Sequence, residues 1–531
     1  MKKIRFQNTS AYNVLDKVRL LVLFSPDFRD MKLYDKYPIH VTNSLSGKKE
    51  LFKPVNQDHV GMYVCGPTVY SDVHLGNVRT FLAFDVIFRY LMYLGYKVRY
   101  VRNITDVGHL ENDDDDGEDK IGKKARLEKL EPMEIVKHYT EDFHHVLRQF
   151  NFLPPSIEPS ATGHIVEQIE ITKKLIERGF AYVVNGSVYF DVLKYNEQHN
   201  YGILSKRVVE DLMESGRKLD SQDEKKNKVD FALWKKASPS HIMRWPSPWS
   251  DGFPGWHIEC TVMSTKYLGE TFDIHGGGID LKFPHHECEI AQSIGAIGKQ
   301  PVNYWIHSNM LTVNGQKMSK SLGNSFLPRE LFSGTHSLLE KGYGPMTVRF
   351  FMLQSHYSST LDFSNEALNA AEKGFKKLSN ALVILKKLSH PGGAIKNTGL
   401  TETLTKLIDD LFINMSDDFN TAKTLAVLFE MAARINDFKS GNASFNQIDL
   451  ETFERFKKAY IGFLEDVLGL KEEEEHNQEL LTGVINVLIE LRKKAREDKN
   501  YKLSDKIRDD LKAMGIQLMD GKEGEMNFTI E

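Results

Sequence analysis

The chain has 531 residues, of which 41% are hydrophobic and 27% are charged, and its net charge is −4. Because one hydrophobic core rarely serves more than about 250–300 residues, this length predicts several domains. The near-neutral charge excludes a chain that binds nucleic acid over its whole surface, so any such surface must be local.

The N-terminal segment and the cysteines indicate the cell compartment. Residues 1–30 are interpreted as an extension, because their apolar core at 20–24 is shorter than the ~7–15 residues of a signal peptide. No apolar run reaches the ~18 residues of a membrane span. The three cysteines, Cys65, Cys260 and Cys288, lie far apart. Such a sparse, odd set argues against disulfides and predicts the cytoplasm, with no membrane partner.

A β-loop-α-β unit is predicted next. Residues 60–65 (VGMYVC) have the pattern of a buried strand, and residues 74–95 that of a helix. Residues 96–105 supply a second strand, which is typical of a parallel sheet. The apolar face of the helix consists of Phe81, Phe84, Phe88 and Leu91.

Strand and helix alternate again after residue 250, so the sheet is expected to continue beyond a charged insert. The predicted fold class is α/β: a Rossmann-type, doubly wound, parallel-sheet catalytic domain with an inserted domain, a helical bundle and a small C-terminal domain. The predicted ranges are 31–110 and 250–325 for the catalytic domain, 111–249 for the insert, 326–364 for a junction, 365–470 for the bundle and 476–531 for the C-terminal domain.

The bundle is predicted from helical stripes. One consists of Phe375, Leu378, Leu382 and Leu385, and a second follows a cap at Asn420 or Thr421. Further on, residues 492–512 hold nine Lys and Arg against five acids. This stretch is either a solvated helix pair or a surface for a phosphate backbone.

The run FPHHECEIAQS (283–293) raises the possibility of a metal site. His285 and Glu289 are four residues apart and share a helix face. Cys65 ends the first strand, and strand ends in an open α/β sheet meet at one crevice, where distant residues such as Cys260 can join them. Cys65, Cys260 and His285 with either Cys288 or Glu289 would suit zinc. The residue pattern alone leaves both sets open.

Two further motifs have the chemistry of phosphate binding. HLGN (74–77) opens the first helix directly after a strand, so that His74 and the helix N-terminus can face phosphate oxygens. KMSKS (317–321) is expected in a loop after a later strand, with Lys317 and Lys320 as point charges for a triphosphate. Each motif alone is a weak signal, but both at the ends of one sheet are a strong one.

These motifs resemble those of a known family. HLGN is similar to the first motif of the class I aminoacyl-tRNA synthetases, and KMSKS is their second motif. Within that class, MYVCGPTVY, VDFALWK, PGWHIEC, FDIHGGGIDLKFPHHECEIAQS and DDFNTA resemble the cysteinyl-tRNA synthetase family, over residues ~31–520. Two features depart from the family pattern. Asn77 stands where the first motif has a second histidine. The tail GKEGEMNFTIE lacks the family's usual ending, so anticodon contacts by the tail are not carried over.

The resemblance implies particular site residues. It implies one zinc ion on Cys65, Cys260, His285 and Glu289, with Cys288 not a ligand, and a cysteine pocket formed by Thr68, Trp256 and Asp280. Catalysis is implied for His74, Lys317 and Lys320, with Mg²⁺ accompanying ATP. The implied ATP-binding residues are Gly66, His74, Gly76, Asn77, Gly276, Gly277, Gly278, Lys317 and Lys320.

In the implied reaction, L-cysteine attacks the α-phosphate of ATP to form cysteinyl-adenylate with release of pyrophosphate, and the cysteinyl group is then transferred to tRNA(Cys). The chain is expected to be a monomer. A pocket that separates amino acids by size alone gains only about 1–3 kcal/mol per methylene group, which is too little for faithful selection. Zinc would therefore select cysteine by binding its thiolate. Two alternatives are a ligase of the same fold that joins cysteine to an amino-sugar acceptor and a non-catalytic tRNA-binding paralogue. A zinc peptidase is disfavoured because HHECE lacks the order HExxH.

Overall fold

The computed structural model of the chain describes residues 32–110, 119–215, 224–239, 241–319, 322–392, 398–472, 475–513, 516–520 and 526–530. The chain divides into two compact units, which are residues 1–471 and residues 472–531. The predicted N-terminal extension, most of the acidic run 113–119 and Lys320 lie outside the described residues. Within the described residues, no helix is long and apolar enough to cross a membrane.

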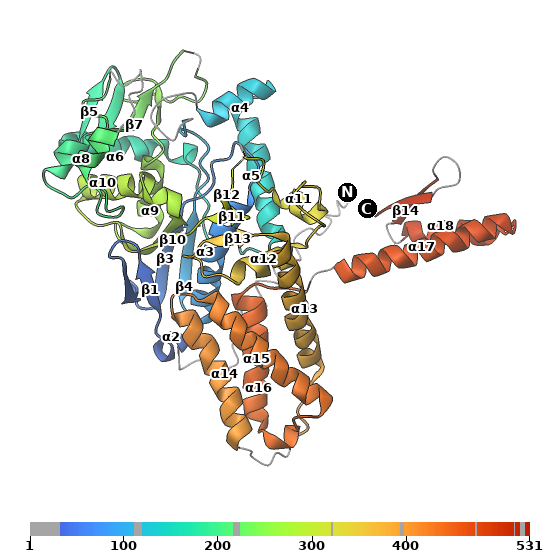
Figure 1. Cartoon of the computed structure of the whole chain (residues 1–531). Coiled ribbons are helices and arrows are strands. Elements are labelled where there is room, and N and C mark those ends of the chain that lie inside the picture. The colour runs from blue at the N-terminus through green and yellow to red at the C-terminus, as the bar shows by residue number, and fades with distance from the viewer. Residues whose placement is uncertain are drawn as a thin grey trace, which may run out of the picture. The chain divides into compact units, whose positions relative to one another are not determined.

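The core of the first unit is a four-stranded parallel sheet (Figure 1). Its strands lie in the order β10-β9-β3-β4, and all neighbouring pairs are parallel. The sheet confirms the predicted α/β fold, because it joins strands from both sides of the insert. The strands are β3 (His59–Val64), β4 (Lys97–Arg102), β9 (Phe272–Gly278) and β10 (Val302–Ser308).

Helices cover both faces of this sheet. α3 (Leu75–Tyr93) packs on one face, because a Cβ atom on Gly276 would lie 2.0 Å from the ring of Phe84. Val64 lies opposite Gly276 and Gly61 is three positions earlier, so Gly61 faces the other side of the sheet. There its Cβ would lie 3.5 Å from Leu268 of α9 (Ile258–Leu268), which contacts α10 (His285–Ile297). The sheet is therefore doubly wound, as predicted.

The strand order reverses between β3 and β9. The chain leaves β3 through α3 to β4 on one side, and β9 later joins the other side of β3. In open α/β sheets, ligands bind in the crevice beyond the carboxyl ends of the strands at such a point. Cys65 follows β3 directly, and its N–H donates to the Gly276 carbonyl of β9 at 3.1 Å.

The segment between β4 and α9 contains its own sheet, which the sequence did not reveal. Four antiparallel strands lie in the order β5-β6-β7-β8, and β8 extends past the predicted end of the insert at residue 249. The domain ranges themselves stay a prediction. The elements are α4 (Lys120–Glu128), α5 (Pro132–Gln149), α6 (Ile165–Glu177), β5 (Ala181–Val184), β6 (Ser187–Phe190), α7 (Val192–Asn196), α8 (Val209–Ser215), β7 (Phe231–Lys236) and β8 (Gly252–Pro254).

A second small sheet carries the beginning of KMSKS. β11 (Leu311–Val313) pairs with β12 (Gln316–Lys317) and, in parallel, with β13 (Leu361–Phe363). The expectation that the motif lies wholly in a loop is therefore wrong for Lys317, which ends a strand. The predicted junction 326–364 is ordered: it contains β13 and the helices α11 (Pro328–Ser333) and α12 (Pro345–Leu353).

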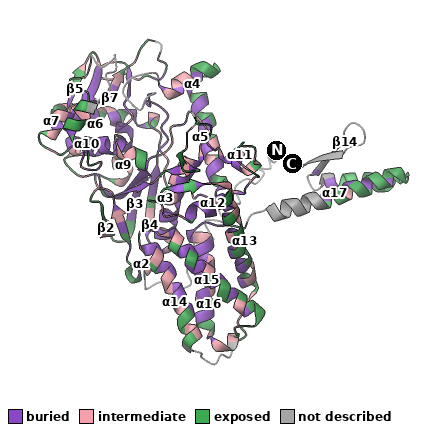
Figure 2. Cartoon of the chain, in the orientation of Figure 1, coloured by how far each residue is buried: buried purple, intermediate pink, exposed green. Residues whose placement is uncertain are grey.

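Helices alone follow, as the stripes predict. The first predicted stripe is buried at all four positions, and Asn420 caps α15 by accepting the N–H of Lys423 at 3.1 Å. Buried residues lie where these helices face one another (Figure 2). The bundle contains α13 (Asn365–Lys387), α14 (Thr398–Ser416), α15 (Thr421–Ser440), α16 (Leu450–Ile461) and a π-helical turn, Gly462–Val467. At the N-terminal end of the described chain, α2 (Leu33–Lys36) precedes the hairpin of β1 (His40–Asn43) and β2 (Lys48–Leu51).

The second unit contains two helices and a hairpin. α17 (Glu475–Glu497) contacts α18 (Tyr501–Ala513), which contacts β14 (Ile516–Asp520), and β14 pairs with β15 (Met526–Ile530). Its core includes Ile485, Ile489, Leu511 and Ile516. The basic stretch 492–512 thus lies on two helices that share one small core.

A buried charge network joins α3 to more distant segments of the first unit. Asp85 accepts hydrogen bonds from Arg89, Arg349 and the N–H of Leu153. Arg349 also donates to the carbonyls of Leu468 and Phe150, each at 2.8 Å. Burial works to raise the pKa of Asp85, but Arg89 and Arg349 outweigh it and hold that pKa below its ordinary value.

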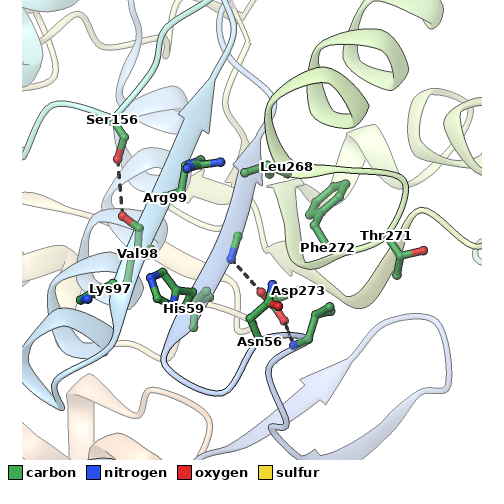
Figure 3. A pocket seen from close by; sticks show the side chains of 13 residues that line it. Asn56, His59, Lys97, Val98, Arg99, Ser156, Leu268, Thr271, Phe272 and Asp273 are labelled. Atoms are coloured by element: carbon green, nitrogen blue, oxygen red, sulfur yellow. Dashed lines mark hydrogen bonds between the residues drawn. The ribbon is translucent and has the colours of Figure 1, made fainter.

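A cavity of about 540 Å³ lies at the opposite, amino-terminal edge of the sheet (Figure 3). His59, Lys97 and Arg99 line it, and Asp273 forms part of its wall. The Asp273 carboxylate accepts the N–H groups of Val55 and Gly61 at 2.5 and 2.7 Å, so its oxygens are engaged by backbone. The predicted site residues lie elsewhere.

Candidate active site and metal-ligand cluster

Four side chains with metal-binding atoms meet beyond the carboxyl ends of β3 and β9. Cys65, Cys260, His285 and Glu289 are all buried, and one donor atom from each lies within 4.8 Å of the others. The two sulfur atoms are 3.7 Å apart. Nε2 of His285 lies 3.3 Å from Oε1 of Glu289, as their spacing on one helix face predicts. The structure thus brings together the four residues that the resemblance implies.

Local structure explains this convergence. Cys65 leaves the sheet at the switch point, Cys260 lies in the first turn of α9, and His285 begins α10. α9 and α10 pack against each other on one face of the sheet, so their first turns present donor atoms to the same strand ends. Cys260, His285 and Glu289 are therefore positioned by helices, and Cys65 by the end of the strand that it follows directly.

Burial disfavours the charged forms of these groups. The pKa of the Cys260 thiol is raised to about 12, chiefly by burial and further by the acids Glu289 and Glu259, against a hydrogen bond with Cys65 that lowers it. Burial also raises the pKa of the Glu289 carboxyl and lowers the pKa of His285 well below its usual range. A positive charge among them would favour the ionised thiols and carboxyl group.

A second donor set overlaps the first. Cys65 and Glu289 also lie within 4.8 Å of donor atoms of His275 and His286. Nε2 of His275 contacts Glu289 at 2.9 Å, and Nε2 of His286 lies 3.3 Å from the sulfur of Cys65. Sequence reasoning missed His275, which lies inside β9, and gave His286 no ligand role. The only available signal was the number of histidines in IHGGG and HHECE.

Cys288 and Glu287 belong to other surroundings. The sulfur of Cys288 lies 3.5 Å from the Tyr201 hydroxyl, within an apolar cluster, and it belongs to neither donor set. The Glu287 carboxylate accepts the N–H groups of Leu204 and Ser205. Helix geometry accounts for Glu287, which is two positions from His285 and therefore on another face. Cys288 is three positions from His285, so its contacts, and not its spacing, separate it from the cluster.

The predicted pocket residues Thr68 and Trp256 lie on either side of a histidine that sequence reasoning missed. The ring of His109 stacks on Trp256, with centroids 4.0 Å apart and planes at 10°. Nδ1 of His109 lies 2.6 Å from the Thr68 hydroxyl. On its other side, Trp256 contacts the ring of His285 at 4.5 Å. This wall therefore adjoins the metal-ligand cluster, whereas the predicted Asp280 is exposed in the turn before α10.

The two phosphate-binding motifs lie next to each other. His74 caps α3: its Nδ1 accepts the N–H of Asn77, and the Asn77 side chain accepts the N–H of His74. A Cβ atom on Gly76 would lie 3.2 Å from the Met318 methyl group of KMSKS. Lys317 is exposed. The α3 N-terminus and KMSKS thus adjoin, as a shared phosphate site requires.

The predicted nucleotide-binding glycines also have packing reasons. A Cβ atom on Gly66 would lie 1.6 Å from the Asn103 carbonyl, and one on Gly277 would lie 2.9 Å from the His286 ring. At Gly278 the obstacle is the Asp280 carboxylate, at 2.3 Å. Together with Gly276 under Phe84, these contacts exclude side chains whether or not ATP binds. Their role toward ATP stays a prediction.

Comparisons with known proteins decide the family. Residues 51–373 match the family of tRNA synthetases class I (C) catalytic domains, and residues 413–472 match the DALR domain. A cysteine–tRNA ligase of Cytophaga hutchinsonii is 56% identical over 91% of this chain and 97% of its own length. One from Bacteroides thetaiotaomicron is 54% identical over 92% of this chain and 98% of its own length. The chain belongs to the cysteine–tRNA ligase family.

Solved structures agree with the fold of this family. A methionyl-tRNA synthetase of Mycobacterium tuberculosis, solved with methionyl-adenylate, aligns with a TM-score of 0.53 at 14% identity, over 77% of this chain and 89% of its own. At that identity the likeness shows the fold alone.

Proposed function

We propose that this chain activates L-cysteine with ATP and transfers the cysteinyl group to tRNA(Cys). The observation that carries the proposal is the position of the Cys65–Cys260–His285–Glu289 cluster at the switch point of the sheet, beside Thr68 and Trp256. The relatives called cysteine–tRNA ligase, matched over more than nine tenths of the chain, support it.

The donor set fits one zinc ion. Two sulfurs, an imidazole nitrogen and a carboxylate oxygen are ligands that zinc accepts, and four is its usual number. Cys65, Cys260, His285 through Nε2 and Glu289 through Oε1 would hold the ion. When bound, zinc supplies a position that prefers a substrate thiolate to a hydroxyl, and so separates cysteine from serine. Trp256 and Thr68 would shape the pocket, and Asp280 would meet the substrate ammonium.

Activation then depends on holding the cysteine carboxylate in line with the α-phosphate of ATP. His74 at the α3 N-terminus and the lysines Lys317 and Lys320 would stabilise negative charge on the phosphates as pyrophosphate leaves, with Mg²⁺ accompanying ATP. Asn77 is held in the capping box, so we assign it to positioning His74 and the helix N-terminus. Gly66, Gly76 and the glycines of β9 would leave room for the nucleotide.

The tRNA would contact the helical bundle and the second unit. The DALR match at residues 413–472 supports the bundle, and the nine cations between residues 492 and 512 support α17 and α18. The proposal includes a monomer in the cytoplasm, in keeping with three free cysteines. The domain ranges predicted from the sequence are part of the same proposal.

The test is cysteine-dependent exchange of pyrophosphate into ATP, followed by charging of tRNA(Cys), with serine as the control amino acid. Both activities with cysteine and neither with serine are expected. Exchange without charging would favour the amino-sugar ligase. The absence of both activities would contradict the enzyme and leave the non-catalytic tRNA-binding paralogue.

A further inference from the structure

We infer that His109 is a positioning residue of the cysteine site: it holds the Trp256 indole and the Thr68 hydroxyl in place, and thereby sets the affinity for the amino acid. This inference deepens the proposed function and rests on it. His109 lies in the loop between β4 and α4, outside every motif that carries the family resemblance.

Backbone contacts fix this loop against the pocket. Thr105 exchanges hydrogen bonds with the segment of Thr68, because its N–H donates to Pro67 and its carbonyl accepts from Val69. On the other side, Gly108 has a φ of +80°, and a Cβ there would lie 2.4 Å from the Pro254 carbonyl. This close approach needs glycine, and it brings the next residue, His109, against the chain that leads to Trp256.

Hydrogen bonds also fix the imidazole. Nε2 of His109 lies 2.7 Å from the ammonium of Lys120, and the ring is buried. An ammonium only donates, so in this pair Nε2 is the acceptor. The proton of a neutral ring is then on Nδ1, which donates to the Thr68 hydroxyl. Lys120 thus selects the tautomer that orients Thr68.

Ring contacts connect His109 to the metal-ligand cluster through Trp256. Trp256 lies between His109 on one side and His285 on the other, with centroid distances of 4.0 and 4.5 Å. Trp256 is only partly buried, so its indole needs a neighbour that limits rotation. His109 supplies that neighbour, since its ring is parallel to the indole and bonded at both nitrogens.

Three variants separate stacking from hydrogen bonding. His109→Ala removes both, and His109→Phe keeps a ring against Trp256. Lys120→Met removes the tautomer selection, together with the contact of the ammonium with the Tyr70 ring. The matched controls are His390→Ala, a histidine with hydrogen bonds in the bundle, and Lys124→Met, another lysine of α4. Thermal unfolding of all five identifies any loss of fold.

The readouts are the Kd for cysteine by calorimetry and, in pyrophosphate exchange, the separate KM values for cysteine and ATP. His109→Ala should raise the Kd and KM for cysteine by about tenfold or more, and His109→Phe and Lys120→Met should do so less. The KM for ATP should change less than twofold, and the controls should match wild type. Unchanged cysteine affinity in His109→Ala, or an equal rise in both KM values, overturns the inference.

These readouts separate the inference from the proposed function. Wild-type protein that binds cysteine in a His109-dependent way but shows no exchange would support the inference and contradict the activity. Wild-type protein with normal exchange and His109 variants of unchanged affinity would do the reverse. A wild-type protein that binds no cysteine contradicts both.

Discussion

Two groups of buried ionisable side chains lie in the first unit, and they differ in how their polar atoms are satisfied. In the network of Asp85, Arg89 and Arg349, opposite charges pair, and the guanidinium groups also bond to backbone carbonyls. In the cluster around Cys65, the groups are thiols, acids and imidazoles with no buried cation among the described side chains. There Oε2 of Glu259 and Nδ1 of His275 have no hydrogen-bond partner within the described part of the chain.

This difference separates a structural role from a binding role. A buried network that is fully paired needs nothing more, and removing a member leaves a charge without its partner. In the second group, burial raises the pKa of the acids and lowers that of His285, so it disfavours the charged forms and no side chain there supplies a positive charge. We therefore expect the first group to govern unfolding and the second to govern ligand binding, which mutation can test.

The largest expected effect is at the cluster. Glu289→Ala removes one proposed ligand and should lower cysteine-dependent pyrophosphate exchange by about 100-fold or more, with loss of bound zinc. The measurement is zinc content per chain together with exchange rate. A variant that keeps its zinc and its rate would contradict the assignment of Glu289.

Cys288→Ala is the matched control on the same helix. Its sulfur lies among apolar side chains and beside Tyr201, so zinc content and exchange should stay within about twofold of wild type. Alanine is chosen because position 288 is buried, where a polar replacement would need hydrogen-bond partners. Loss of zinc in this variant would mean that Cys288 is a ligand.

The next effect is on folding. Arg349→Met leaves part of the Asp85 charge uncompensated in a buried site and should destabilise the protein by about 3–5 kcal/mol. Urea unfolding measures this, and the KM for cysteine of the folded variant should be unchanged. Lys406→Met is the control, since it breaks the exposed pair with Asp410 and should cost less than about 1 kcal/mol. Equal losses in both variants would contradict a structural role for the network.

The smallest effect concerns pH. The folded pKa of Asp85 lies below its ordinary value of 3.8, so its stabilising contribution is present above pH 3.8 and is lost as the pH falls toward the folded pKa. The difference in unfolding free energy between wild type and Asp85→Asn should therefore be constant from pH about 6 to about 4 and shrink below that. A difference that grows on acidification would contradict the depressed pKa.

Much of the local structure follows from the sequence, since it depends on neighbours along the chain. The stripe of Phe375, Leu378, Leu382 and Leu385 and the cap at Asn420 lie where the pattern predicts them. His285 and Glu289 share a helix face for the same reason. That Cys65 and Cys260 join them needed the rule for strand ends and the family resemblance, and the structure then placed their sulfurs 3.7 Å apart.

Contacts between residues far apart in sequence became known only from the three-dimensional fold. No local pattern pairs Asp85 with Arg349, stacks His109 on Trp256, directs His275 toward Glu289 or joins β11 to β13. Periodicity specifies which face of an element is buried, but not which element covers that face. Local patterns thus predicted the parallel strands, the main helices and the kind of chemistry, but not the antiparallel sheet of the insert. Packing determined which histidines surround the proposed metal and which of them we infer to hold its pocket in place.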